Sequence, residues 1–118
     1  MSAPSAVEGY QPLIAPVEFV SVKPQADATD EGRASVTFVV KGKTQQDAVM
    51  AAKSEETIRR GLHEVRVLGI SGAGLSTQGV ALPCDAEGKP FESLNIPEAT
   101  DPNTVFYATI TNTYLGAA

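Results

Sequence analysis

Alternating apolar and polar positions predict β-strands near both ends of the chain. Residues 17–23 and 33–41 each alternate over the length of a strand, and the turn-rich residues 24–32 between them favour an antiparallel hairpin with a long loop. Residues 104–116 show the clearest alternation and predict the last strand. One face of that strand is apolar and the other is rich in threonine, with Phe106, Ala108 and Ile110 on the first and Tyr107, Thr109, Thr111 and Thr113 on the second. Such a threonine-rich face suits a half-exposed sheet, or a sheet that lies against another subunit.

A helical period begins after Thr44. Thr44 can cap the helix, and Asp47 lies three residues later near the positive end of the helix dipole. The predicted helix ends near His63, because Gly61 weakens the last turns by about 1 kcal/mol relative to Ala. Its buried stripe contains Ala48, Ala51, Ala52, Ile58, Leu62 and Val65. Two i,i+4 ion pairs are expected on its exposed side, Glu55–Arg59 and Glu56–Arg60.

The region between the helix and the last strand gives weaker patterns. Residues 65–70 favour a third strand, and the glycine-rich residues 71–79 favour a loop. Residues 80–82 predict a short edge strand that Pro83 stops. Residues 84–103 contain several prolines and turn residues, so they are expected to form a loop pinned to the core by a few apolar side chains.

Together these elements predict an α+β fold with an antiparallel β-sheet of four to five strands, one packed α-helix and an extended N-terminal arm. A chain of 118 residues suits one domain, here residues 17–118. Prolines interrupt residues 1–16 and no period is visible there, so this segment is expected to form the arm. The arm carries three large apolar side chains that need a surface to pack against: Tyr10, Leu13 and Ile14.

The charge of the chain restricts its partners. The net charge is −5, which argues against direct binding to nucleic acid, where counterion release requires many Lys and Arg side chains. Residues 33–66 carry seven Lys and Arg against four Asp and Glu, whereas the segments on either side are acidic. Two interpretations stay open: complementary patches that steer head-to-tail assembly, or neutralisation within one fold. We see no signal peptide, and no apolar run is long enough for a bilayer, so no membrane partner is expected.

Candidate chemistry is sparse. Gly42, Lys43 and Thr44 resemble the end of a phosphate-binding loop, but Thr37 occupies the position of its first glycine. His63 and Cys84 are the only histidine and the only cysteine, too few ligands for a zinc site. Carboxylates within residues 27–31 and 85–87 leave a carboxylate-based site open, although solvated turns explain both stretches more simply. We therefore expect no catalytic, cofactor-binding or metal-binding residue, and not an enzyme.

Two resemblances suggest functions of different classes. The strand–helix–strand run of residues 33–82, with Gly69 and Ile70 before residues 75–77, is loosely similar to one half of the SIMPL-domain proteins of bacterial envelopes. That similarity implies a small ligand- or peptide-binding module that uses loops 69–79 and 84–103. The combination of an apolar arm, a β-rich body and a threonine-rich last strand resembles small structural proteins of tailed-phage virions.

The second resemblance leads to our main functional hypothesis, a non-enzymatic structural subunit of a larger symmetric assembly. The resemblance implies a virion component, such as a capsid decoration or tail protein, that is cytoplasmic before assembly. Its expected partners are copies of itself and other subunits of the assembly, and no cofactor is expected. The predicted interface comprises three arm residues and three residues of the last strand: Tyr10, Leu13, Ile14, Tyr107, Thr109 and Thr111.

Overall fold

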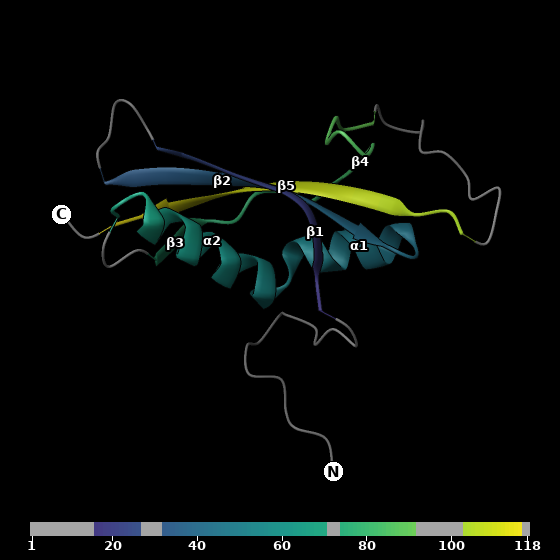
Figure 1. The fold of residues 1–118 in the computed structure, drawn as a ribbon, viewed down its shortest axis with the longest axis horizontal. Helices are drawn as coiled ribbons and strands as arrows, with labels where there is room; N and C mark the ends of the chain where they lie inside the picture. The colour runs from purple at the N-terminus through teal and green to yellow at the C-terminus, as the bar shows by residue number, and fades with distance from the viewer. Residues whose placement is uncertain (1–15, 27–31, 71–73, 92–102, 117–118) are drawn as a thin grey trace, which may run out of the picture.

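The computed structural model describes residues 16–26, 32–70, 74–91 and 103–116. Within these ranges the chain forms a five-stranded antiparallel sheet with two helices packed on one face (Figure 1). The elements are β1 (Glu18–Ala26), β2 (Arg33–Gly42), α1 (Gln45–Lys53), α2 (Glu55–Val67), β3 (Gly74–Thr77), β4 (Leu82–Cys84) and β5 (Phe106–Leu115). The α+β class and the antiparallel sheet are confirmed, whereas the single predicted helix is wrong because the structure has two. Residues 1–15 of the predicted arm lie outside the described residues.

The sheet is built around β5. Its strand order is β1-β2-β5-β3, and β4 also pairs with β5. Strand β3 pairs with the end of β5 and β4 with its beginning, so two short strands share one edge of β5. Strands β1 and β2 form the antiparallel hairpin that the sequence predicts. Strand β1 also continues through Pro24, which the edge position of the strand tolerates.

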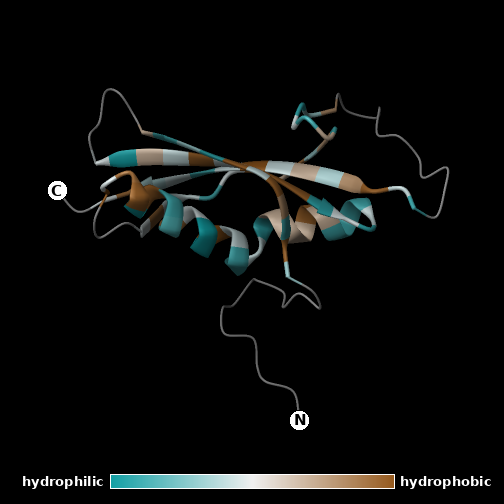
Figure 2. Cartoon of the chain, viewed as in Figure 1, coloured by the Kyte–Doolittle hydropathy of each residue, from teal (hydrophilic) through white to brown (hydrophobic). Residues whose placement is uncertain are grey.

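Alternation along β2 and β5 places the core between the sheet and the helices. Ala34, Val36, Phe38 and Val40 of β2 are fully buried, and Ala108 and Ile110 of β5 lie beside them, as predicted. The buried stripe of the helices meets this face through Ala48, Ala51, Ala52, Ile58 and Val65. The outward turns of α2 are largely hydrophilic (Figure 2). The largest fully buried side chain is Tyr114, which the sequence reasoning did not assign to the core.

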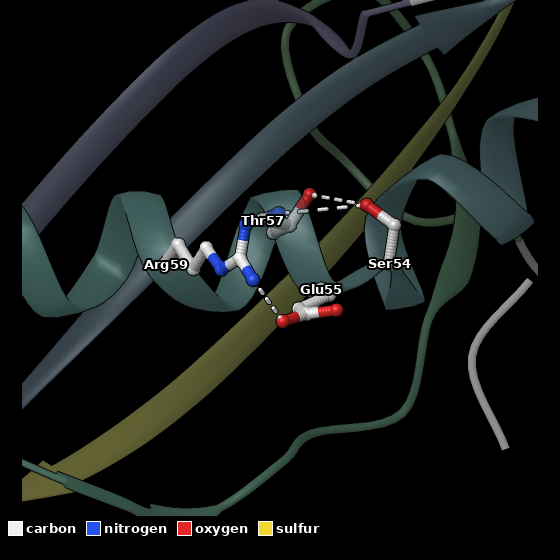
Figure 3. Close-up of polar contacts among 4 residues, drawn as sticks. All are labelled: Ser54, Glu55, Thr57 and Arg59. Atoms are coloured by element: carbon white, nitrogen blue, oxygen red, sulfur yellow. Dashed lines mark hydrogen bonds and ion pairs between the residues drawn. The ribbon is translucent and has the colours of Figure 1, made fainter. Parts of the chain in front are cut away.

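Ser54 separates the two helices. It is the C-cap of α1 and the N-cap of α2, and its backbone is extended. The Ser54 hydroxyl donates to the Ala51 carbonyl over 2.7 Å and accepts from the Thr57 amide, and Thr57 Oγ1 donates to the same carbonyl over 2.7 Å. Figure 3 shows the contacts between Ser54 and Thr57 beside the Glu55–Arg59 ion pair. Because side chains satisfy the groups that the helix ends expose, the break is stable. The predicted cap at Thr44 is confirmed, since its hydroxyl accepts from the Asp47 amide.

The predicted end of the helix is wrong. Helix α2 continues past His63 to Val67, and residues 65–67 are helical rather than the start of a strand. Gly61 does not mark a frayed end but lies against Tyr114, where a Cβ atom would overlap the Tyr114 hydroxyl. The chain then turns at Gly69, whose positive φ favours glycine.

Two further sequence assignments near this turn need correction. Residues 74–77 of the predicted loop form β3, because β5 offers them a pairing edge. The short edge strand lies at Leu82–Cys84 and includes Pro83, instead of stopping before it.

Among the predicted ion pairs of the helix, Glu55–Arg59 is confirmed, but Arg60 pairs with Glu64 over 2.9 Å. Glu56 instead accepts from the Val17 amide, so it holds the start of β1 onto α2.

Candidate functional site

A buried polar network lies between α2 and the sheet. The Tyr114 hydroxyl donates to the Ile58 carbonyl over 3.1 Å, and Asn112 Nδ2 lies 3.5 Å from the same hydroxyl. Asn112 Oδ1 in turn accepts from the Gly79 amide over 3.1 Å. Tyr114 and Asn112 are both fully buried, so a substrate has no access to them. The network therefore joins α2, β5 and the segment between β3 and β4, and its role is structural.

The face of the sheet opposite the helices carries a ladder of hydroxyl groups. Ser35 Oγ lies 3.3 Å from Thr113 Oγ1, and Thr37 Oγ1 lies 2.9 Å from Thr111 Oγ1, each pair joining β2 to β5. We call these four residues, Ser35, Thr37, Thr111 and Thr113, the hydroxyl face. The contact between Thr37 and Thr111 is exposed to solvent. The hydroxyl face thus offers donors and acceptors that are already held in fixed positions.

A tight turn covers another part of the same side of the sheet. Asp85 Oδ1 accepts from the amides of Glu87 and Lys89, and Gly88 adopts a positive φ. A Cβ atom at Gly88 would lie 2.7 Å from a methyl carbon of Val39, so the turn packs directly on β2. Figure 1 shows β4 and this turn on the side of the sheet away from α1 and α2. The turn explains why Val39 is buried although it faces away from the helices.

The two edges of the sheet differ. Strand β1 is a nine-residue edge strand that pairs only with β2 among the described elements. The opposite edge is interrupted between β3 and β4, and Val80 in that interval is 76% exposed. Among the described strands, β1 therefore presents the longer edge. A continuous edge strand can pair with a further strand, whereas an interrupted one offers short segments.

The predicted interface residues of the last strand occupy three different environments. Thr111 belongs to the hydroxyl face and is exposed. Tyr107 is half-buried, and its carbonyl accepts from Gln45 Nε2 over 3.0 Å. Thr109 is only 8% exposed, and its hydroxyl donates to the Phe38 carbonyl. Tyr10, Leu13 and Ile14 lie outside the described residues.

The side chains with possible chemistry lie apart from one another. Cys84 is buried, and this burial, with a smaller contribution from the Asp85 carboxylate, raises the pKa of its thiol to about 11. The thiol is therefore protonated at neutral pH and a poor nucleophile. His63 lies on the exposed side of α2. Within the described ranges, no group of three or more His, Cys, Asp and Glu side chains could hold a metal ion.

The two loops of the alternative hypothesis are partly described. Residues 74–77 of the first loop pair with the end of β5. In the second loop, Cys84 pairs with Tyr107 of β5 and Gly88 lies against Val39. In the part of the chain that the structure describes, neither helix has the length and apolar character needed to cross a membrane. Among the described residues, the hydroxyl face and the β1 edge are two surfaces that a partner could contact. A comparison of the chain with protein-family models, with curated proteins and with solved structures found no match in any of the three.

Proposed function

We propose that this chain is a non-enzymatic structural subunit of a larger symmetric assembly, and that the assembly is a tailed-phage virion in which the chain serves as a capsid decoration or tail protein. The observation that carries the proposal is the hydroxyl face on the side of the sheet that the helices leave open. A surface of short, mutually bonded side chains suits contact with a flat partner.

Binding a partner through the hydroxyl face should cost little side-chain conformational entropy. Thr37 and Thr111 already hold each other at 2.9 Å, so a partner fixes few additional rotamers when it binds them. Ordering a long side chain at an interface costs about 0.5–1.5 kcal/mol, and short hydroxyl side chains cost less. Threonine also supplies a methyl group for contact and a hydroxyl for hydrogen bonds. A protein partner with a polar, flat surface fits these properties.

The setting within a virion is supported by the organisation of the chain. An apolar arm of residues 1–16, a β-rich body and a threonine-rich last strand resemble the small structural proteins of tailed-phage virions. In the proposed assembly, Tyr10, Leu13 and Ile14 of the arm pack on a neighbouring subunit. Their burial would contribute about 25 cal/mol per Å² before the ordering costs are subtracted.

Light scattering coupled to size-exclusion chromatography tests the proposal. The full chain is compared with a chain lacking residues 1–16 and with a Thr111→Arg variant, which places a bulky charge on the hydroxyl face. Circular dichroism of all three samples controls for folding. Electron microscopy of the largest species would show whether it is a ring or another closed symmetric particle.

We expect the full chain to form a defined oligomer that both changes weaken. A folded monomer after arm removal supports arm-mediated assembly, and loss of assembly in Thr111→Arg assigns the contact to the hydroxyl face. If the full chain is a monomer at every concentration, self-assembly is wrong. In that case the ligand- or peptide-binding module becomes the better hypothesis, and binding to loops 69–79 and 84–103 should be measured.

A further inference from the structure

Strand β1 carries two charges of opposite sign. They are Glu18 near its beginning and Lys23 five residues later. In a regular strand, residues five apart lie on opposite faces, because side chains alternate. Here the register of β1 against β2 shifts between Phe19 and Ser21, so the strand contains one extra residue at Val20.

This irregularity places both charges on the same face. Glu18 is opposite Lys41 and Lys23 is opposite Thr37, and both partners alternate with the core residues of β2. Phe19 and Val22 instead pack against the core. Between Glu18 and Lys23 the strand therefore reads as outward, inward, irregular, outward, inward, outward. Read from either end, this six-residue segment therefore starts with an outward residue followed by an inward one.

We propose that β1 pairs in antiparallel fashion with β1 of a second copy, in the register that sets Glu18 opposite Lys23 of the other copy. This inference rests on the proposed function and specifies one contact of the assembly. The two-fold axis passes through the segment between Val20 and Ser21. Each dimer then contains two Glu18–Lys23 pairs, and the two sheets continue into one sheet of ten strands, given the five strands of each copy.

The other residues of the segment fit this register. Phe19 faces Val22 of the second copy on the helix side, an aromatic and a β-branched residue that pair well across strands. Val20, which is 43% exposed in the single chain, is covered beside Ser21 of the other copy. Shifting the register by one residue would place inward residues opposite outward ones, so one-residue slips are disfavoured.

Two features limit the pairing to a closed dimer. Pro24 lacks an amide hydrogen and follows the segment directly, so it weakens extension of the ladder. An antiparallel contact of a strand with itself uses the same surface on both copies, so it closes after two subunits.

Glu18 already lies 3.1 Å from Lys41 of its own chain, and in the dimer it would also face Lys23 of the second copy. The carboxylate would separate two lysines that otherwise repel each other.

Charge reversal in the full chain tests the proposed register. Lys23→Glu places two glutamates opposite each other, and we expect the association constant of the dimer to fall roughly tenfold in low salt. The double variant Glu18→Lys with Lys23→Glu restores opposite charges across the axis but loses the Glu18–Lys41 pair within the chain, so it should recover part of the loss. Lys53→Glu makes the same change of net charge on α1, which does not contact β1, and should leave association unchanged. Sedimentation velocity over a dilution series measures all four proteins.

Disulfide trapping gives a second measurement that does not depend on affinity. Residues directly opposite in an antiparallel pair have Cα atoms about 4.5–5.5 Å apart, within the range of a disulfide. A mixture of Glu18→Cys and Lys23→Cys chains should form the mixed dimer faster than either chain alone forms its own dimer. Native Cys84 is buried and remains in all samples. Mixtures with Lys53→Cys, on α1, serve as the control.

The outcomes separate this inference from the proposed function. Weakening by Lys23→Glu, recovery in the double variant and preferential trapping of the mixed dimer support the β1 pairing. If the full chain assembles but neither reversal nor trapping shows any preference, the β1 pairing is wrong while assembly through the arm or the hydroxyl face stands. If the full chain never associates, both the pairing and the proposed assembly are wrong.

Discussion

The two faces of β2 and β5 use alternate residues of the same strands for different purposes. On the helix side, Val36, Phe38 and Ile110 are almost completely buried and form the centre of the core. On the other side, Thr37 and Thr111 pair their hydroxyls in solvent. Residues adjacent in sequence therefore belong alternately to the buried core and to the solvent-exposed face. The inner face determines whether the chain folds, whereas on the outer face Thr37 and Thr111 remain exposed to solvent.

The sharpest test of this comparison uses two neighbours in β2. Phe38→Ala removes a fully buried ring that packs 5.7 Å from the ring of Phe19, and we expect a loss of about 3–5 kcal/mol in the free energy of unfolding. Thr37→Ala on the other face should cost no more than about 0.5 kcal/mol. Urea unfolding followed by circular dichroism measures both. Similar losses for the two variants would break the comparison.

A smaller loss of stability is expected at Gly61, where the absence of a side chain lets α2 lie against Tyr114. Gly61→Ala would normally stabilise a helix by about 1 kcal/mol, but here the added Cβ atom meets the Tyr114 ring, so we expect a loss of about 1–3 kcal/mol. In a Tyr114→Ala background the same change should become neutral or stabilising. A double-mutant cycle of urea midpoints measures this coupling. Stabilisation of the native background by Gly61→Ala would contradict the close approach.

The loss of stability should be smaller still at Ser54, the residue between α1 and α2. Ser54→Ala removes the hydroxyl that caps α2 and bonds to Ala51, and we expect a loss of about 1 kcal/mol. Thr44→Ala at the exposed cap of α1 should cost less, because water can replace its hydroxyl. Thermal unfolding of the two variants checks the order. An equal loss at both caps would show that burial of Ser54 adds nothing.

The smallest effect near neutral pH concerns Cys84. Its folded-state pKa is raised to about 11, above the value of about 8.5 for an unfolded thiol. Between these two pH values the unfolded state loses its proton first, so the free energy of unfolding should fall as pH rises. A Cys84→Ala variant should show a shallower decline over pH 8.5–11 and no change of slope near pH 7. Parallel slopes for the two proteins would exclude this role of the thiol.

The sheet could be predicted largely from local patterns, because alternation and burial coincide along β2 and β5. Phe38 and Ile110 were assigned to the core by this period alone, and both are buried. Tyr114 was not, since its hydroxyl suggests an exposed position unless a partner such as the Ile58 carbonyl is known. Strand β3 was also missed, because only pairing with β5, distant in sequence, makes its glycine-rich residues a strand.

The helical layer was harder to predict. Propensity alone favoured an end near His63 and a strand at residues 65–70, because Gly61 weakens a helix. In the structure, contact with Tyr114 requires glycine at position 61, and α2 continues to Val67. The break at Ser54 follows from two hydroxyls that converge on one carbonyl, a geometry that spacing does not reveal.

The candidate contact surfaces were predictable only in part. Threonine alternation indicated Thr111, yet it also included Thr109, which hydrogen bonds to the Phe38 carbonyl and is mostly buried. The irregularity at Val20 has no sequence signature that we recognise. The β1 edge and its arrangement of charges therefore became visible only once the strand register was known.

The break between α1 and α2 at Ser54 affects the order in which the molecule folds. It divides the helical layer into segments of nine and thirteen residues, and isolated helices shorter than about 12–15 residues are marginal in water. Neither segment is then expected to nucleate early and guide the strands. The hairpin of β1 and β2, closed over a short separation in sequence, is the better nucleus. Helix α1 contacts both β2 and β5, so its packing should be complete only after β5 has joined the sheet. Pulsed hydrogen exchange should accordingly protect the amides of β2 before those of α1.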